Sequence, residues 1–324
     1  MAKILRVFSK QIARFWPDQK LYATKTPVFH PFYHVVSNKP LPHILNYPYF
    51  NEKQFEQQLD YFLKYFEPVS LADLYKNTHA GKKTFHLSFD DGLRECAEIV
   101  APLLLKKGIP ASFFVNSGFV DNKELFHRYK ASLIVSEMAK HPDTQAEAFL
   151  HKNNLNCTTV LQASFSQVDI LDRAAELLEL DFQVFLQEQK PYLTTQQVKS
   201  LHQKGFTIGG HSHKHPELWK LSEKKQLKQI SKSMDWVTKT VHPDIKAFAF
   251  PYTDDGISSK LLRKLKAERI CDITFGTAGI KYDEVESHFQ RYPAEQDGHF
   301  KENLKAEFVY FKLRKILGKE TVKH

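Results

Sequence analysis

Three histidines alternate in the stretch GGHSHKHPEL, at positions 211, 213 and 215. Neutral imidazole is a common metal ligand, and a catalytic zinc ion usually takes three protein ligands and one water molecule. His211 and His215 are four residues apart, a spacing that places two side chains on one face of a helix. In a loop they can also converge on one ion. The stretch therefore indicates either a metal site or a group of exposed loop histidines.

Two adjacent carboxylates are the next candidates for chemistry. Asp90 and Asp91 directly follow the run TFHLSF, in which apolar and polar residues alternate as they do in a strand. Proteins with parallel sheets place their sites at the carboxyl ends of strands, so Asp91 is a candidate third metal ligand. Asp-Gly is also a common turn pair, and DDG recurs at residues 254–256. The motif alone is therefore weak evidence.

A third motif, FAFPY at residues 248–252, ends another apolar run. A proline followed by an aromatic residue at a strand end can form a rigid wall beside a site. Pro251 and Tyr252 are therefore candidates for the wall of a pocket, although a plain strand end has the same pattern.

The segments between these motifs alternate between helical and strand patterns. Residues 84–89, 95–108 and 109–120 read as strand, helix and strand, which is a βαβ unit with parallel strands. Helical patterns at 194–205, 222–241 and 258–270 then alternate with strand patterns at 206–213, 247–252 and 271–277. Repeated βα units around one core predict a barrel or an open doubly wound sheet.

Two segments depart from this alternation. Residues 122–190 carry helical patterns, and residues 141–190 contain eight acidic against three basic residues in a chain that is basic overall. We interpret 122–190 as a helical insertion. Residues 1–27 form a basic amphipathic segment, because Ile4, Phe8, Ile12 and Trp16 repeat every four residues. That helix either packs on the protein body or lies on a membrane surface.

Composition narrows the class of protein. The chain has 324 residues, 42% hydrophobic and 26% charged, which is ordinary for a soluble globular protein. Its three cysteines, Cys96, Cys157 and Cys271, form no CxxC pair, which argues against a disulfide framework. The net charge of +9 comes without a nucleic-acid motif, so we expect no nucleic-acid partner. With no export signal visible, we expect a cytoplasmic location at the inner membrane face.

The three motifs in combination are specific enough to indicate a protein family. SFDDG, then HSxxH about 120 residues later, then FAFPY resembles the polysaccharide deacetylase (NodB-homology) family, carbohydrate esterase family 4. The resemblance covers roughly residues 28–120 and 190–295. It implies a distorted (β/α) barrel with fewer than eight strands, here over residues 28–324 with the insertion at about 122–190. It also implies a divalent metal, with zinc as the first choice.

The resemblance also implies residue roles. Asp90 would be the catalytic base, and Asp91, His211 and His215 would bind the metal. Pro251 and Tyr252 would line the substrate pocket, with the Tyr252 N–H in the oxyanion hole. His213 corresponds to no ligand position.

The chain departs from the family pattern at two places. Ala249 stands where the family usually has an arginine, and we expect Arg291 to orient Asp90 instead. The family's histidine acid, which follows a leucine-rich strand, has no clean match. His288 and His299 are the nearby candidates, of which we choose His299. Asp272 is the candidate to orient that acid.

His34 is a further candidate at the barrel mouth. It is either a buried structural histidine or a group that contacts the substrate or supplies the acid.

We therefore expect a metal-dependent hydrolase that removes an acetyl group from a sugar of a polysaccharide or glycan precursor. Two alternatives are a degenerate barrel that only binds carbohydrate and an amidase that acts on a small non-sugar substrate. The oligomeric state is left open.

Overall fold

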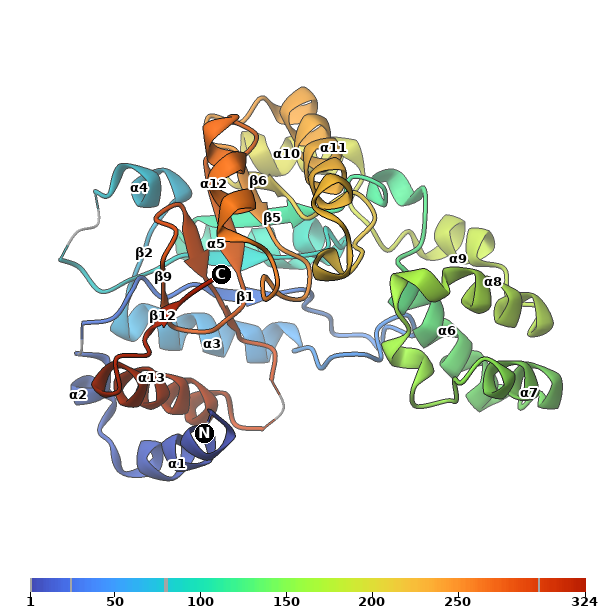
Figure 1. Cartoon of the computed structure of the whole chain (residues 1–324), viewed down its shortest axis with the longest axis horizontal. Coiled ribbons are helices and arrows are strands. Elements are labelled where there is room, and N and C mark those ends of the chain that lie inside the picture. Colours follow the sequence, from blue (N-terminus) through green and yellow to red (C-terminus); the bar gives the residue numbers. More distant parts are fainter. Residues whose placement is uncertain (1, 24, 79–80, 297) are drawn as a thin grey trace.

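Parallel strands form the centre of the molecule, and helices surround them (Figure 1). The computed structural model describes residues 2–23, 25–78, 81–296 and 298–324. The central sheet contains β1 (Pro31–Tyr33), β4 (Leu87–Phe89), β5 (Ala111–Val115), β6 (Thr207–Gly210), β7 (Ala247–Ala249), β8 (Ile273–Gly276), β10 (His288–Gln290) and β11 (Tyr292–Pro293). Its order is β10-β8-β7-β6-β5-β4-β1-β11, and each of these neighbouring pairs is parallel.

The two outer strands of this order belong to one stretch of chain. β10 and β11 are separated only by Arg291. β10 pairs with β8 on one side, and β11 pairs with β1 on the other. Seven chain segments therefore close the sheet into a distorted (β/α) barrel, and the predicted fold is confirmed. The strand pattern at 288–293 is too short to be recognised in the sequence.

Two small parallel pairs lie outside the barrel. β2 (Glu67–Pro68) pairs with β3 (Thr84–Phe85), just before β4. β9 (Tyr282–Asp283) pairs with β12 (Thr321–Val322), which brings the end of the described chain back to the barrel.

Helices cover the barrel, and those at 95–108, 194–205, 222–241 and 258–270 follow the predicted pattern. The covering helices are α3 (Glu52–Tyr65), α4 (Leu71–Lys76), a π-helical turn (Cys96–Val100) that continues into α5 (Ala101–Lys107), α10 (Thr195–Gln203), α11 (Glu223–Val241), α12 (Ser259–Ala267) and α13 (Phe300–Ile316). Ser70 and Thr194 each form a capping box, which satisfies backbone N–H groups at the starts of α4 and α10. Gly108 ends α5 with a left-handed φ of 64°.

The main core lies between the barrel and its helices. Phe29, Phe62, Phe66 and Phe308 are buried and pack against one another in tilted and edge-on contacts, with the centroids of contacting rings 5.4 to 5.7 Å apart. Buried aromatic rings remove large apolar areas from water, so this cluster ties α3 and α13 to the sheet.

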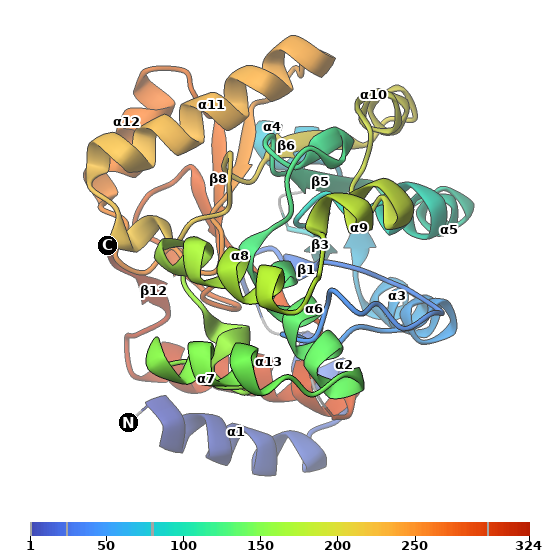
Figure 2. The same ribbon diagram turned by 90° about the vertical axis from the view of Figure 1, so that its right-hand side faces the viewer.

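The insertion consists of α6 (His127–Lys140), α7 (Thr144–Lys152), α8 (Val168–Leu177) and α9 (Phe182–Gln189). These helices project from one side of the barrel and face the viewer in Figure 2. They have a small apolar core of their own, which includes Ile134, Leu150 and Leu171. The start of α6 and part of α9 reach the barrel mouth, where Tyr129 and Leu186 belong to one apolar cluster with Leu93.

The basic segment forms α1 (Ala2–Phe15) and α2 (Asp18–Tyr22). α1 lies alongside α13 (Figures 1 and 2), and Ile12, Ala13 and Trp16 pack into the main core. The other side of α1 exposes Ile4 and Phe15, which are 73% and 87% accessible. Within the described residues we find no helix with the length and apolarity needed to cross a bilayer.

Candidate metal centre and active site

The predicted ligands follow two strands that are separated by one strand in the barrel. Asp90 and Asp91 follow β4, and His211 and His215 follow β6. All four side chains are buried. Asp91 and His215 have positive φ angles of 69° and 51°. This left-handed backbone is unfavourable for residues other than glycine, and such strain gathers at functional sites. At Asp91 it supplies the turn that brings two successive carboxylates to one site.

The ligand atoms converge on Asp91. Its Oδ1 lies 3.2 Å from His215 Nε2 and 3.6 Å from His211 Nε2. His211 Nδ1 is 2.8 Å from the Ala249 carbonyl oxygen, which can only accept, so Nδ1 carries the proton. The Nε2 lone pair of His211 therefore faces the carboxylates.

This donor set fits a metal ion. Asp91 Oδ1 is buried without a hydrogen-bond donor among the described residues. Asp91 Oδ2 accepts from the Tyr129 hydroxyl at 3.2 Å. Burial, His215 and Arg291 among other groups act on His211 and lower its pKa to about 4, so its imidazole is neutral at pH 7. One carboxylate and two imidazoles, each oriented by an outer hydrogen bond or by packing, suit Zn²⁺.

Arg291 occupies the centre of the barrel and is fully buried. Its Nη1 and Nη2 donate to the two oxygens of Asp90 at 2.7 and 2.8 Å. Its guanidinium carbon lies 4.3 Å above the centre of the Phe32 ring. Burial alone would raise the pKa of Asp90, but the Arg291 charge lowers it below its ordinary value. Asp90 is therefore ionised and held in one orientation.

His34 follows β1 and meets Glu295, which follows the neighbouring strand β11. His34 Nδ1 lies 2.6 Å from Glu295 Oε2, and the N–H groups of His34 and Val35 donate to Glu295 Oε1. Burial opposes protonation of His34, but the Glu295 carboxylate outweighs it and raises the pKa to about 9. His34 is therefore a protonated group at neutral pH.

A cavity of about 190 Å³ joins these groups. It is lined by Phe32, His34, Asn46, Tyr47, Asp90, Asp91, Phe126, Arg128, His211, His215, Tyr252 and Thr277. Phe126 and Arg128 come from the insertion, so the insertion forms part of the wall. Tyr252 has a φ of 57°, and its ring centre lies 4.6 Å from that of His215.

Three predicted residues lie elsewhere. Asp272 precedes β8 and accepts from the Lys246 N–H at 2.8 Å, at the opposite end of the barrel from the site. His299 is the N-cap of α13 and lines a separate hollow of about 970 Å³ against α1 and α3. Pro251 is buried but does not line the cavity. The structure therefore places none of these three residues in the lining of the cavity.

Two other histidines also lie outside the cavity. His288 faces Asp254 at 3.1 Å and has no exposed side chain surface. His213 Nδ1 hydrogen bonds with Ser117 Oγ at 2.9 Å, which agrees with its prediction as a bystander.

Gly209 and Gly210 directly precede His211 and are packed closely by their neighbours. A Cβ on Gly209 would lie 2.5 Å from the Phe114 ring, so close packing requires glycine there.

The sequence reasoning missed Glu295, Arg128 and Tyr129. Glu295 lies four residues after Arg291, just past the last strand, and an acidic residue at that place is a usable signal. Arg128 and Tyr129 begin a helix that the resemblance does not cover, and no local pattern marks them.

The parallel barrel and the Asp-His-His cluster at the carboxyl ends of its strands place this protein in the class of barrel proteins with a candidate metal centre. Residues 77–269 match the family model for polysaccharide deacetylase. The match spans more than half of the chain, so the chain belongs to the polysaccharide deacetylase family. Membership supports deacetylase activity, which is hydrolysis of a carbon–nitrogen bond.

Solved structures agree on the fold. A Streptococcus pyogenes deacetylase, PplD, in complex with acetate has a TM-score of 0.56 at 16% identity, over 88% of this chain and 99% of that chain. IcaB from Ammonifex degensii has a TM-score of 0.55 at 15% identity, over 88% and 98%. A de-N-acetylase from Aggregatibacter actinomycetemcomitans has 0.52 at 13%, over 86% and 99%. No curated protein matches the chain.

Proposed function

We propose that this protein is a metal-dependent hydrolase that removes the acetyl group from an acetylated sugar of a polysaccharide or glycan precursor. The observation that carries the proposal is the buried cluster of Asp91, His211 and His215 beside the Arg291–Asp90 pair. Family membership supports the reaction class.

Each group has one task in this proposal. A divalent ion held by Asp91, His211 and His215, zinc as the first choice, would lower the pKa of water towards ~7 and polarise the acetyl carbonyl. Asp90, kept ionised by Arg291, takes the proton of the attacking water. The backbone N–H of Tyr252 stabilises the oxyanion that forms on the carbonyl oxygen.

The leaving amine needs a proton, and we assign His34 to supply it. His34 lines the cavity, and Glu295 occupies its Nδ1, so the transferable proton is on Nε2. An acid at this place removes the need for the leucine-strand histidine. Asp90 as a base held by Arg291, together with His34 as an acid held by Glu295, argues against a barrel that only binds carbohydrate.

The cavity suits a small reacting group. Its volume of about 190 Å³ is below the ~300–1,000 Å³ of most ligand pockets. It has room for an acetamido group and part of one sugar ring, while the rest of a glycan lies outside. Tyr47 and Tyr252 present the aromatic surfaces on which a sugar ring packs.

The test is release of acetate from N-acetylglucosamine oligomers, with and without a chelator. We expect activity that disappears with chelator and returns with Zn²⁺. Asp90→Asn and Asp91→Asn should abolish it, whereas Asp255→Asn, an exposed aspartate of the second DDG, should not. Turnover of small acetamides but not oligomers would instead support the amidase. Tight oligomer binding without turnover would support the binding protein.

We also propose that α1 contacts an anionic membrane surface. Its exposed side combines Ile4, Val7, Phe8 and Phe15 with the exposed cations Lys10 and Arg14. Such a pattern favours the interface of a bilayer. Flotation with vesicles containing anionic lipid should carry the protein upward, and Phe8→Ser with Phe15→Ser should release it. Equal flotation of both proteins would contradict the proposal.

A further inference from the structure

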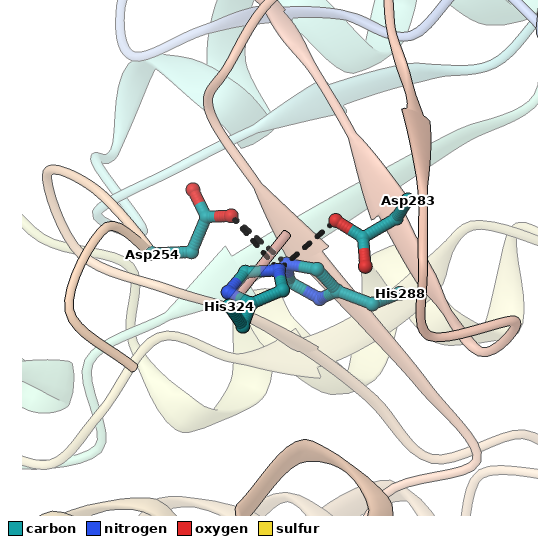
Figure 3. A group of neighbouring side chains, drawn as sticks. All are labelled: Asp254, Asp283, His288 and His324. Carbon is teal, nitrogen blue, oxygen red and sulfur yellow. Dashed lines mark hydrogen bonds and ion pairs between the residues drawn. The ribbon is translucent and has the colours of Figure 1, made fainter. Parts of the chain in front are cut away.

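A second group of histidines and carboxylates lies on the flank of the barrel, outside the cavity (Figure 3). It consists of Asp254, Asp283, His288 and His324. Asp254 follows β7, Asp283 ends β9, His288 begins β10 and His324 follows β12. Figure 3 shows the two carboxylates pointing from opposite sides towards the two imidazole rings. Three stretches of the chain, around residues 254, 283–288 and 324, thus bring these side chains to a common point.

The distances suit tetrahedral coordination. His288 Nε2 lies 3.1 Å from Asp254 Oδ2, and His324 Nε2 lies 3.0 Å from Asp283 Oδ2 and 3.9 Å from Asp254 Oδ2. Four ligands at about 2.0–2.1 Å from a tetrahedral zinc ion stand roughly 3.4 Å apart. The observed separations lie on both sides of that value, and one atom from each residue lies within 4.8 Å of the others.

The outer hydrogen bonds leave the correct ring nitrogens facing inward. His324 Nδ1 lies 3.1 Å from the Ile257 carbonyl oxygen, so Nδ1 is the protonated nitrogen. His288 Nδ1 is 2.8 Å from Thr274 Oγ1. Both Nε2 atoms therefore point at carboxylate oxygens. Metal-binding histidines have this arrangement, with the second nitrogen held by an outer acceptor.

Because this group is buried, the negative charges of its two carboxylates must be balanced by positive charges nearby. The four side chains are at most 3% exposed, so two carboxylates there require two positive charges. Either two protons on the imidazoles or one divalent ion supplies them. Gln290 Nε2 also donates to Asp254 Oδ2 at 2.6 Å and to Asp283 Oδ2 at 2.9 Å. Each oxygen has a second lone pair, so this amide leaves room for an ion.

We propose that Asp254, Asp283, His288 and His324 bind a structural divalent transition-metal ion, with Zn²⁺ as the first choice. A closed set of four protein ligands is typical of a structural zinc site, whereas a catalytic site leaves one position open for water. The ion fastens β12 and the end of β9 to the barrel. It also braces the substrate cavity, because Asp254 Oδ1 accepts from the Thr277 N–H, and Thr277 Oγ1 donates to the Tyr252 carbonyl.

The experiment counts zinc on the full chain without a histidine tag. The protein is stripped with a chelator, loaded with Zn²⁺, freed of excess and assayed by elemental analysis. We expect two zinc ions per chain in the unsubstituted protein and one in His324→Ala. Asp283→Asn is the second variant, since it removes one ligand without removing volume. His299→Ala, an exposed histidine of neither cluster, is the control and should keep both ions.

Asp91→Asn separates this inference from the proposed function. It should keep one ion, and Asp91→Asn with His324→Ala should keep none. If the catalytic cluster binds no metal, Asp91→Asn equals the unsubstituted protein while His324→Ala still loses an ion. The inference is overturned if His324→Ala and Asp283→Asn both hold as much zinc as the unsubstituted chain. In that case the cluster is a protonated ion-pair network.

Stability gives a readout independent of stoichiometry. A ligand that binds only the folded state raises the melting temperature. Zn²⁺ should therefore stabilise Asp91→Asn, which retains the second site, more than it stabilises His324→Ala with Asp91→Asn. Equal Zn²⁺-induced shifts of the melting temperature in these two variants would contradict the inference.

Discussion

Arg291 donates hydrogen bonds to both carboxylate oxygens of Asp90 at 2.7 and 2.8 Å, although the two residues are 201 positions apart. The barrel closes through the segment that carries Arg291, so the junction between β10 and β11 supplies the cation that the third motif lacks at Ala249. The base and its partner therefore depend on ring closure rather than on neighbouring residues.

Arg291→Lys should shift the acid limb of the kcat/KM profile upward in pH. Lysine keeps the charge but loses the two-pronged contact, so the pKa of Asp90 is lowered less and a higher pH is needed to ionise it. The measurement is kcat/KM from pH 4 to 9. Arg263→Lys on the exposed side of α12 is the matched control. An acid limb that does not move would show that Arg291 does not tune Asp90.

His34→Gln should lower kcat for an acetylated amine by about 10²–10⁴-fold, the typical contribution of a general acid. A nitrophenyl acetate should be much less affected, because its leaving group departs without a proton. The ratio of the two rates is the readout. Equal losses on both substrates would mean that His34 only shapes the cavity.

Tyr129→Phe should weaken metal binding by about 10–100-fold, the usual effect of removing an outer hydrogen bond to a ligand. Its hydroxyl donates to Asp91 Oδ2 at 3.2 Å and also lies 2.8 Å from the Tyr47 hydroxyl. Competition with a chelating dye measures the affinity. Tyr75→Phe, at an exposed tyrosine, is the control. Unchanged affinity would mean that the insertion does not support the metal centre.

The metal-free protein should lose stability as pH falls below about 6.5. Burial, aided by Arg94, lowers the pKa of His43 to about 4, and burial lowers that of His86 to about 4. The unfolded chain takes up these protons near pH 6.5 and the folded chain does not. Each histidine then costs about 1.4 kcal/mol per pH unit between those values. Chemical denaturation at pH 7 and pH 5 measures the loss.

His43→Phe tests that assignment. The His43 ring packs on Tyr129 and Phe185, and neither ring nitrogen has a hydrogen-bond partner among the described residues. Phenylalanine keeps the packing and removes the titration, so stability should fall less between pH 7 and pH 5. His141→Phe, at a side chain that is 78% exposed, should leave the pH dependence unchanged. An unchanged pH dependence in His43→Phe would contradict the assignment.

Local patterns were sufficient for much of this protein. Alternation predicted the strand before Asp90, and the strand pattern at 206–213 contains β6 but runs past its end. Ser70 and Thr194 cap helices that the local pattern predicts. Periodicity and turn chemistry act within a few residues, so a single stretch of sequence carries them. The order of the three motifs on strand ends then brought Asp91, His211 and His215 into one proposed site.

Only the tertiary structure decided the partners of those residues. It placed His34 with Glu295 at the cavity, put His299 and Asp272 outside it and brought Tyr129 of the insertion against Asp91. It also changed the meaning of the second DDG, because Asp254 joins a buried cluster with His324. These contacts depend on strand order and barrel closure, which bring together residues whose separation in sequence holds no periodic signal. The sequence by itself therefore determined which residues are candidate metal ligands and which strands precede them. The fold determined which charged side chains come into contact.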